Sequence, residues 1–201
     1  MTDLDRWWPL RDRADLRDRL LAAYDDPARG YHDRRHLVDV LEHLDELMPD
    51  THPTREVLLL AAWFHDAVHE GTTDDEERSA RLAERELAHR PDLADVARLV
   101  RLTASHRPAD DDLDGQLLCD ADLAILAAGP ERYDDYTAGV RREYSHVPEP
   151  AFREGRRRLL QDLLAKPTLF HTATARRRWE ARARANVQQE IEALGGSSGG
   201  Q

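Results

Sequence analysis

The chain is organised around the segment Leu58-Leu59-Leu60-Ala61-Ala62-Trp63-Phe64-His65-Asp66-Ala67-Val68-His69. Its first seven residues are all apolar, and the lack of a polar face predicts an element that is buried on every side. The run leads directly into His65 and Asp66, so it places an imidazole and a carboxylate where isolated charges are costly. A bound metal ion would make this pair favourable, because it requires a neutral imidazole and an ionised carboxylate. A mutual hydrogen bond between the two side chains is the simpler alternative.

Length and charge predict one soluble domain. The chain has 201 residues, enough for a single large core, and no shift in composition divides it. The formal net charge of -11 argues against a general affinity for nucleic acid or for an anionic membrane. Any phosphate-binding site must therefore be local, and self-association to a homo-oligomer stays open.

Cysteine usage and the N-terminal sequence predict a cytoplasmic protein. Cys119 is the only cysteine, which excludes an intramolecular disulfide and a zinc site built from thiolates. The first eight residues, Met-Thr-Asp-Leu-Asp-Arg-Trp-Trp, lack the apolar segment of a signal peptide. No apolar run approaches the ~18 residues of a membrane span.

Apolar residues recur with a helical period along most of the chain. In residues 34–48 the apolar positions form one stripe, and His36 shares it and therefore faces the core. Further helices are predicted around 16–24, 76–88, 92–105 and 117–127, after Pro130, and over 152–164 and 175–194. No strand alternation or hairpin signal occurs, so the fold class is all-α, with a domain over 1–194 and a flexible tail over 195–201. The acidic segment 110–115 is predicted to be a solvated loop, since it lacks the bidentate Glu of a calcium site.

Four candidate metal ligands fall on core-facing positions of three predicted helices. They are His36, His65 with Asp66, and either Asp120 or Asp122. Residues two apart on a helix point about 200° away from each other, so only one of the two aspartates can face the same centre. Asp122 has apolar neighbours on both sides at helical spacing and is the favoured ligand, with Asp120 as a hydrogen-bonding support.

The order His36, His65-Asp66, Asp122 resembles the H…HD…D signature of the HD superfamily of metal-dependent phosphohydrolases. Several longer blocks resemble one bacterial subfamily of uncharacterised "predicted metal-dependent phosphohydrolases". These blocks are Tyr31-His32-Asp33-Arg34-Arg35-His36, Ala62-Trp63-Phe64-His65-Asp66, Glu76-Glu77-Arg78-Ser79-Ala80, Asp120-Ala121-Asp122-Leu123-Ala124-Ile125-Leu126, Arg141-Arg142-Glu143-Tyr144 and a C-terminal Ala-Arg-Ala-Asn-Val. The resemblance implies a single helical bundle of the HD type and leaves the substrate open.

Two residues depart from the subfamily pattern. Asp75 stands where Asn is usual, and His69 stands where an aromatic residue is usual. The second change creates His65-Asp66-Ala67-Val68-His69, which mimics the H-E-x-x-H helix of zinc proteases with Asp in place of Glu. Asp is one methylene shorter than the Glu that those enzymes use as base, so His69 is better interpreted as a polar residue at the rim of the site.

The ligand set suits one divalent ion. Imidazoles and carboxylates without a thiolate favour Mn²⁺, Fe²⁺, Co²⁺, Ni²⁺ or Zn²⁺ over Mg²⁺. Asp66 and one of Glu76 and Glu77 are candidate catalytic residues, the glutamates as general acid or base through a water. A helix N-terminal carboxylate is the plain alternative for both glutamates. Candidates for supporting the ligands or binding substrate are His32, His69, His106, Asp120, Arg141 and Arg142.

The resemblance and this ligand set imply a phosphohydrolase that cleaves a phosphoester of a small metabolite, such as a nucleotide, with a metal-activated water. A two-metal HD-type oxygenase or lyase is a second hypothesis, and it needs extra ligands such as His106. A non-catalytic HD fold that senses a ligand is a third. Metal stoichiometry and metal-dependent activity distinguish the three.

Overall fold

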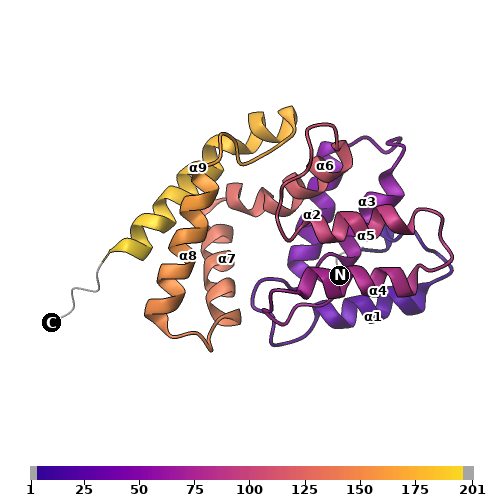
Figure 1. Ribbon diagram of the computed structural model, residues 1–201, viewed down its shortest axis with the longest axis horizontal. Coiled ribbons are helices and arrows are strands. Elements are labelled where there is room, and N and C mark those ends of the chain that lie inside the picture. Colours follow the sequence, from indigo (N-terminus) through magenta and orange to yellow (C-terminus); the bar gives the residue numbers. More distant parts are fainter. Residues whose placement is uncertain (1–3, 197–201) are drawn as a thin grey trace.

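The computed structural model describes residues 4–196, and every regular element in that range is helical, as the periodicity predicted (Figure 1). The helices are η1 (Leu4–Trp7), α1 (Ala14–Tyr24), α2 (Arg34–Leu47), α3 (Arg55–Phe64), α4 (Asp75–Glu86), α5 (Leu93–Leu102), α6 (Leu113–Leu123), η2 (Ala124–Ala127), α7 (Pro130–Glu143), α8 (Glu149–Leu164) and α9 (Ala173–Gly195).

The apolar run of the sequence forms α3, which is the centre of the N-terminal half. All its residues from Val57 to Phe64 are buried, because α2, α4, α5 and α6 pack around it. The N-terminal segment covers it as well: Trp63 donates a hydrogen bond from Nε1 to the carbonyl of Trp7, and Trp8 packs edge-on against the Trp63 ring. The helix ends at Phe64, so His65 and Asp66 lie in the turn that follows it.

Side-chain caps fix the starts of α2 and α6. The Asp33 carboxylate accepts hydrogen bonds from the backbone N–H groups of Arg35 and His36, which places His36 in the first turn of α2. Asp112 caps α6 in the same way by accepting from the N–H of Gly115. The helix therefore starts at Leu113, and the prediction of a loop through residue 115 was wrong at its C-terminal end.

Buried side chains gather in two groups. Figure 1 shows the helices that carry them, with the N-terminal helices on the right and α7 to α9 on the left. The first group joins the N-terminal segment and α1 to α6, and the second joins η2, α7, α8 and α9. Leu47 at the end of α2 packs against both groups. Cys119 is fully buried in α6.

The C-terminal helix is longer than predicted. It continues through Gly195, so the predicted tail begins inside α9, and residues 197–201 lie outside the described range. Within residues 4–196, no helix combines the length and apolarity needed to cross a lipid bilayer.

Candidate metal centre

His36, His65 and Asp66 each place one donor atom within 4.8 Å of the others, and Asp122 contacts both imidazoles; we call these four residues the His36 cluster. The two imidazoles face each other, with His36 Nε2 3.0 Å from His65 Nε2. Asp66 Oδ2 lies 3.0 Å from the His65 nitrogen and 3.2 Å from the His36 nitrogen. Asp122 Oδ1 lies 3.2 Å from His36 Nε2 and 3.7 Å from His65 Nε2. Residues from α2, the turn after α3 and the end of α6 thus meet in one place.

The spacing of these donor atoms matches that around a bound ion. Metal–ligand bonds of about 2.1 Å put neighbouring donors about 3.0 Å apart in an octahedral site and about 3.4 Å apart in a tetrahedral one. The contacts within the cluster span 3.0 to 3.7 Å. The residues present therefore fit a divalent metal ion.

One atom of the His36 cluster is left without a hydrogen bond. Asp66 Oδ2 is buried and has no hydrogen-bond partner among the described residues, although two imidazole nitrogens lie within 3.2 Å. These two close contacts are ion pairs when the imidazoles are protonated. On the far side of its ring, His65 Nδ1 lies 2.8 Å from the carbonyl of Ala62. That contact requires the proton on Nδ1, so Nε2 presents a lone pair to the cluster.

Exposure shows which side of the cluster is open. The side chains of His36 and His65 are 2% and 1% exposed, whereas those of Asp66 and Asp122 are 14% and 13% exposed. The imidazoles thus lie deeper in the fold, and the carboxylates are the more exposed members of the cluster. A water molecule or a small substrate would approach from the carboxylate side.

Asp122 and Asp120 have different environments. His106 Nε2 lies 2.8 Å from Asp122 Oδ2, so the second carboxylate oxygen of Asp122 is held while the first faces the cluster. The backbone of His106 has a φ of 48°, a conformation uncommon outside glycine. Asp120 is fully buried and accepts hydrogen bonds from the N–H groups of His171 and Thr172, each at 2.7 Å. It links α6 to the start of α9 and takes no part in the His36 cluster.

The carboxylates strongly change the proton affinity of the imidazoles. Burial alone would lower the pKa of His36, but Asp122 and Asp66 outweigh it and raise that pKa to about 10. Burial would likewise raise the pKa of Asp66, yet His65, His32 and His36 hold it well below its usual value. In the metal-free protein the cluster therefore holds protons that a cation would displace.

Two residues outside the predicted set position the turn that carries Asp66. The Tyr24 hydroxyl, at the end of α1, accepts a hydrogen bond from the N–H of Asp66 at 3.3 Å. Arg29 donates to the carbonyls of His32 and Asp66 at 2.7 and 2.8 Å and to that of Ala67 at 3.3 Å. One guanidinium thus ties the loop before α2 to the turn after α3. Neither residue carries a sequence motif that announces this role.

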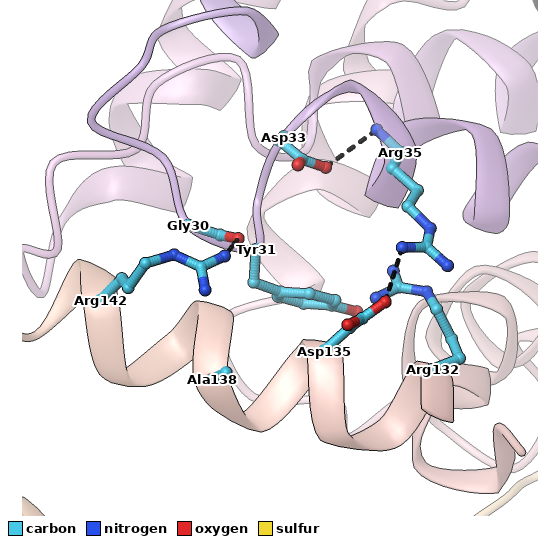
Figure 2. Close-up of a pocket in the computed structure, with 8 residues that line it drawn as sticks. All are labelled: Gly30, Tyr31, Asp33, Arg35, Arg132, Asp135, Ala138 and Arg142. Carbon is cyan, nitrogen blue, oxygen red and sulfur yellow. Dashed lines mark hydrogen bonds and ion pairs between the residues drawn. The ribbon is translucent and has the colours of Figure 1, made fainter. Parts of the chain in front are cut away.

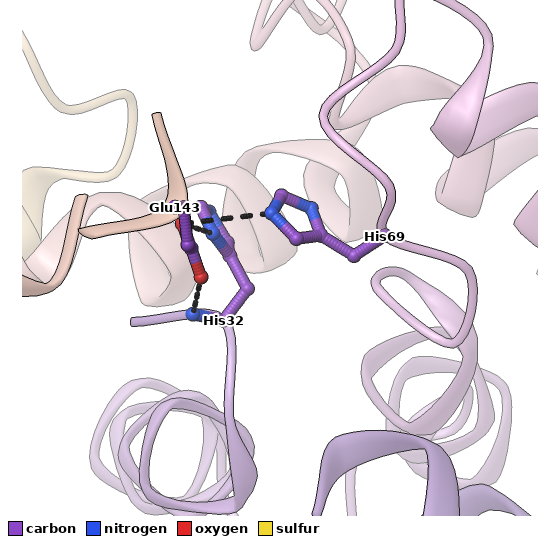
Figure 3. A group of neighbouring side chains, drawn as sticks. All are labelled: His32, His69 and Glu143. Carbon is purple, nitrogen blue, oxygen red and sulfur yellow. Dashed lines mark hydrogen bonds and ion pairs between the residues drawn. The ribbon is translucent and has the colours of Figure 1, made fainter. Parts of the chain in front are cut away.

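A second group, His32, His69 and Glu143, lies beside the first, and we call it the His32 cluster (Figure 3). One ligand atom from each residue lies within 4.8 Å of the others. His32 Nδ1 is 2.8 Å from Glu143 Oε2, and His69 Nε2 is 3.5 Å from the same oxygen. The His32 and His36 ring centroids are 5.5 Å apart, so the two clusters are neighbours.

Glu143 is the residue of this region that the sequence interpretation missed. Its Oε1 accepts hydrogen bonds from the N–H groups of Gly30, Tyr31 and His32 at 2.8 to 2.9 Å. Burial would raise its pKa, but His32, His69 and the N–H of Tyr31 hold that pKa far below the usual range, so the carboxylate is ionised. The only available signal was its place in the block Arg141-Arg142-Glu143-Tyr144.

The first half of α4 fixes the segment that contains His69 and the loop that follows it. Ser79 exchanges hydrogen bonds with the N–H and carbonyl of Val68. The buried Asp75 carboxylate accepts from the N–H groups of Glu70, Gly71 and Thr72. Asp75, which stands where Asn is usual in the resembled subfamily, therefore fixes the loop that follows His69.

The two predicted glutamates of α4 differ in their surroundings. Glu77 pairs with Arg101 at 2.6 Å and with Arg81 at 2.8 Å, and these contacts lower its pKa to about 2. Glu77 thus joins α4 to α5, while its role as an acid or base stays a prediction. Glu76 lies in the first turn of α4 near Tyr144.

The structure does not support the alternative of a zinc-protease helix. The two histidines of an H-E-x-x-H motif must share one helical face, but α3 ends at Phe64. Residues 65 to 69 form turns, and they send His65 into the His36 cluster and His69 into the His32 cluster.

The predicted arginines are mostly committed to structural contacts. Arg141 pairs with Glu149 at 2.8 Å and donates to two backbone carbonyls, which excludes it from the centre. Arg142 donates to the carbonyl of Gly30 and lines a polar pocket of about 250 Å³ (Figure 2). The residues that line this pocket are Gly30, Tyr31, Asp33, Arg35, Arg132, Asp135, Ala138 and Arg142. The ring of Tyr31 connects the pocket to the centre, because it also packs against His36 with centroids 4.7 Å apart.

No protein-family model matches the chain, and comparisons with curated proteins and with solved structures likewise gave no match. The likeness to the HD superfamily therefore depends on the residues themselves and on their order along the chain.

Proposed function

We propose that the protein is a metal-dependent phosphohydrolase of the HD type, with one divalent ion held by His36, His65, Asp66 and Asp122. The observation that carries the proposal is the close grouping of His36, His65 and Asp66, with the Asp122 carboxylate 3.2 and 3.7 Å from the two imidazole nitrogens, in the order of the H…HD…D signature. The buried Asp66 Oδ2, which lies close to both imidazoles without a hydrogen bond, supports it.

The chemistry follows from this donor set. When bound, the ion would lower the pKa of a coordinated water and offset the charge that develops on phosphoryl oxygens. The chain supplies the positions: Ala62 sets the tautomer of His65, and His106 holds the rear oxygen of Asp122. Asp66 and Asp122 face the opening of the site, where the substrate would enter.

A small phosphorylated metabolite, such as a nucleotide, is the proposed substrate. The net charge of -11 disfavours a polyanion, so recognition of phosphate must be local. Arg35, Arg132 and Arg142 line the pocket beside Tyr31, and a phosphate would compete there with Asp135 for Arg35 and with Asp39 for Arg132. Glu76 is the remaining glutamate available for proton transfer through water.

Metal analysis combined with a screen of phosphorylated metabolites tests the proposal. His65→Ala and Asp66→Ala should lose bound metal, hydrolytic activity and melting temperature together, because the ion stabilises only the folded state. His89→Ala, at an exposed position of the loop after α4, serves as the control and should behave like the wild type. If both site variants kept the wild-type metal content, the proposal would be wrong. Metal binding without any phosphoester hydrolysis would favour a ligand-sensing module instead.

A further inference from the structure

We infer that His32, His69 and Glu143 form a second divalent-metal site beside the His36 cluster. This site goes beyond the proposed function, since its donor set is separate from the H…HD…D residues and excludes His106. It would take a borderline transition metal such as Mn²⁺, Fe²⁺ or Zn²⁺, because it offers two imidazole nitrogens, one carboxylate oxygen and no thiolate.

The first argument is the geometry of the three donors. His32 Nδ1 and His69 Nε2 lie 2.8 and 3.5 Å from the same oxygen, Glu143 Oε2. Donors around one ion are about 3.0 to 3.4 Å apart when the bonds are about 2.1 Å long. Only small side-chain adjustments are needed to give the three groups a shared centre.

The second argument is an unpaired atom. His69 Nε2 is buried and has no hydrogen-bond partner among the described residues. Its nearest polar contact is an ion pair with Glu143 Oε2 at 3.5 Å, which lacks hydrogen-bond geometry. A buried nitrogen left without a partner is unfavourable, whereas a nitrogen that coordinates an ion is satisfied.

The third argument is the preorganisation of Glu143. Its Oε1 is fixed by three backbone N–H groups of the loop that carries His32, so its Oε2 has a defined direction. Backbone bonds to the outer oxygen of a ligating carboxylate are typical support for a metal site. The side chain of Glu143 is only 6% exposed, and that of His69 is 13% exposed, whereas that of His32 is 26% exposed. An ion could therefore enter past His32.

Counting bound metal in matched variants tests the inference. The metal-free full chain is equilibrated separately with Mn²⁺ and Zn²⁺, dialysed at a fixed free-metal concentration and analysed for bound equivalents. The wild type should hold two equivalents of at least one metal, and His69→Phe should hold one. Phenylalanine keeps an aromatic ring against His32, whose centroid lies 4.0 Å from that of His69, but has no donor atom. His89→Phe makes the same change at an exposed histidine and should retain two.

The outcomes distinguish this inference from the proposed function. Asp122→Asn should lose the equivalent of the His36 cluster and keep the other. If His69→Phe bound as much metal as the wild type with both ions, the second site would not exist. If only His69→Phe lost metal and Asp122→Asn lost none, the second site would stand and the proposed function would fail.

A crystallographic measurement covers the case in which His69→Phe does not fold. Anomalous diffraction from metal-soaked wild-type crystals should show a peak within bonding distance of His32 Nδ1, His69 Nε2 and Glu143 Oε2. A map with a peak at the His36 cluster and none at these atoms would overturn the inference.

Discussion

Asp120 and Asp122 lie two residues apart in α6, yet the structure gives them unrelated partners. Asp122 faces two imidazoles. Asp120 accepts hydrogen bonds from two backbone N–H groups just before α9. The same substitution at the two positions should therefore damage different properties of the protein.

Asp122→Asn should abolish metal binding at the His36 cluster and reduce phosphoester hydrolysis by more than the ~10–100-fold typical of residues that only support a ligand. Asp120→Asn should keep the metal but destabilise the fold by about 1–3 kcal/mol, because its amide NH₂ would face a backbone N–H. Metal analysis and chemical denaturation of both variants measure these effects. A stable Asp120→Asn without metal, or a metal-loaded Asp122→Asn, would reverse the assignment.

The raised pKa of His36 makes metal binding depend on pH. In the metal-free protein that pKa is about 10, so the imidazole is protonated at neutral pH and a cation must displace the proton. The logarithm of the association constant should rise by up to about one per pH unit for each proton displaced, until the pH reaches the pKa. Calorimetry in buffers of different ionisation enthalpy measures the released proton. Affinity that does not change between pH 7 and 9 would contradict the assignment.

The same group fixes the sign of the stability change. A folded-state pKa above the unfolded value of about 6.5 stabilises the metal-free fold fully below pH 6.5, and that contribution disappears as the pH rises toward 10. The melting temperature of the metal-free protein should therefore fall over this range as far as His36 determines it. Metal loading should remove that trend, because a coordinated imidazole no longer titrates there.

At the scale of the elements, one close crossing positions Glu143. Gly139 in α7 packs against the backbone at Gly30, and a Cβ atom added to Gly139 would lie 2.6 Å from the carbonyl oxygen of Gly30. This approach brings the end of α7 close enough for Glu143 to bind the loop before α2. The proposed second metal site therefore depends on the close backbone contact between Gly139 and Gly30.

Gly139→Ala should push α7 away from this loop and cost about 1–3 kcal/mol, as overpacking usually does. Gly155→Ala is the matched control, because nothing lies within 4 Å of a Cβ added at Gly155 in α8. Removing a helical glycine there should stabilise the protein by about 0.5–1 kcal/mol. Thermal denaturation compares the two variants, and equal stability of both would argue against the tight crossing.

The local sequence pattern predicted the helices, but it missed the start of α6 and the partners that side chains find far along the chain. The stripe of α2 placed His36 in the core because one helical period determines its own inner face. The start of α6 was misplaced because Asp112 turns back to cap Gly115, which converts part of an acidic segment into helix. The pairing of Glu77 with Arg101 could not be predicted from the local pattern, since Arg101 is 24 residues away on α5.

At the scale of the whole molecule, the two clusters combine distant parts of the chain. The backbone groups that bind Glu143 are 111 to 113 residues away, and no periodicity or spacing rule connects them. The HD dipeptide and its partners were accessible to sequence reasoning because buried histidines and aspartates are rare in apolar runs. Glu143 was not, because a glutamate at the end of an amphipathic helix is common.

Residues that hold the metal centre in place come from both hydrophobic groups. The ligands of the His36 cluster lie on the N-terminal helices, whereas α7 provides Glu143 and the segment before α9 binds Asp120. Changes in the C-terminal helices can therefore reach the centre through these two carboxylates.

The burial of Cys119 provides a reporter of motion that requires no engineered label. The only thiol of the chain lies three residues before Asp122, and burial raises its pKa well above the usual value, so it is unreactive while α6 stays packed. The rate at which an alkylating reagent modifies Cys119 therefore measures how often α6 opens locally. A slower alkylation rate after a ligand or ion is added would show how much binding reduces the local opening of α6.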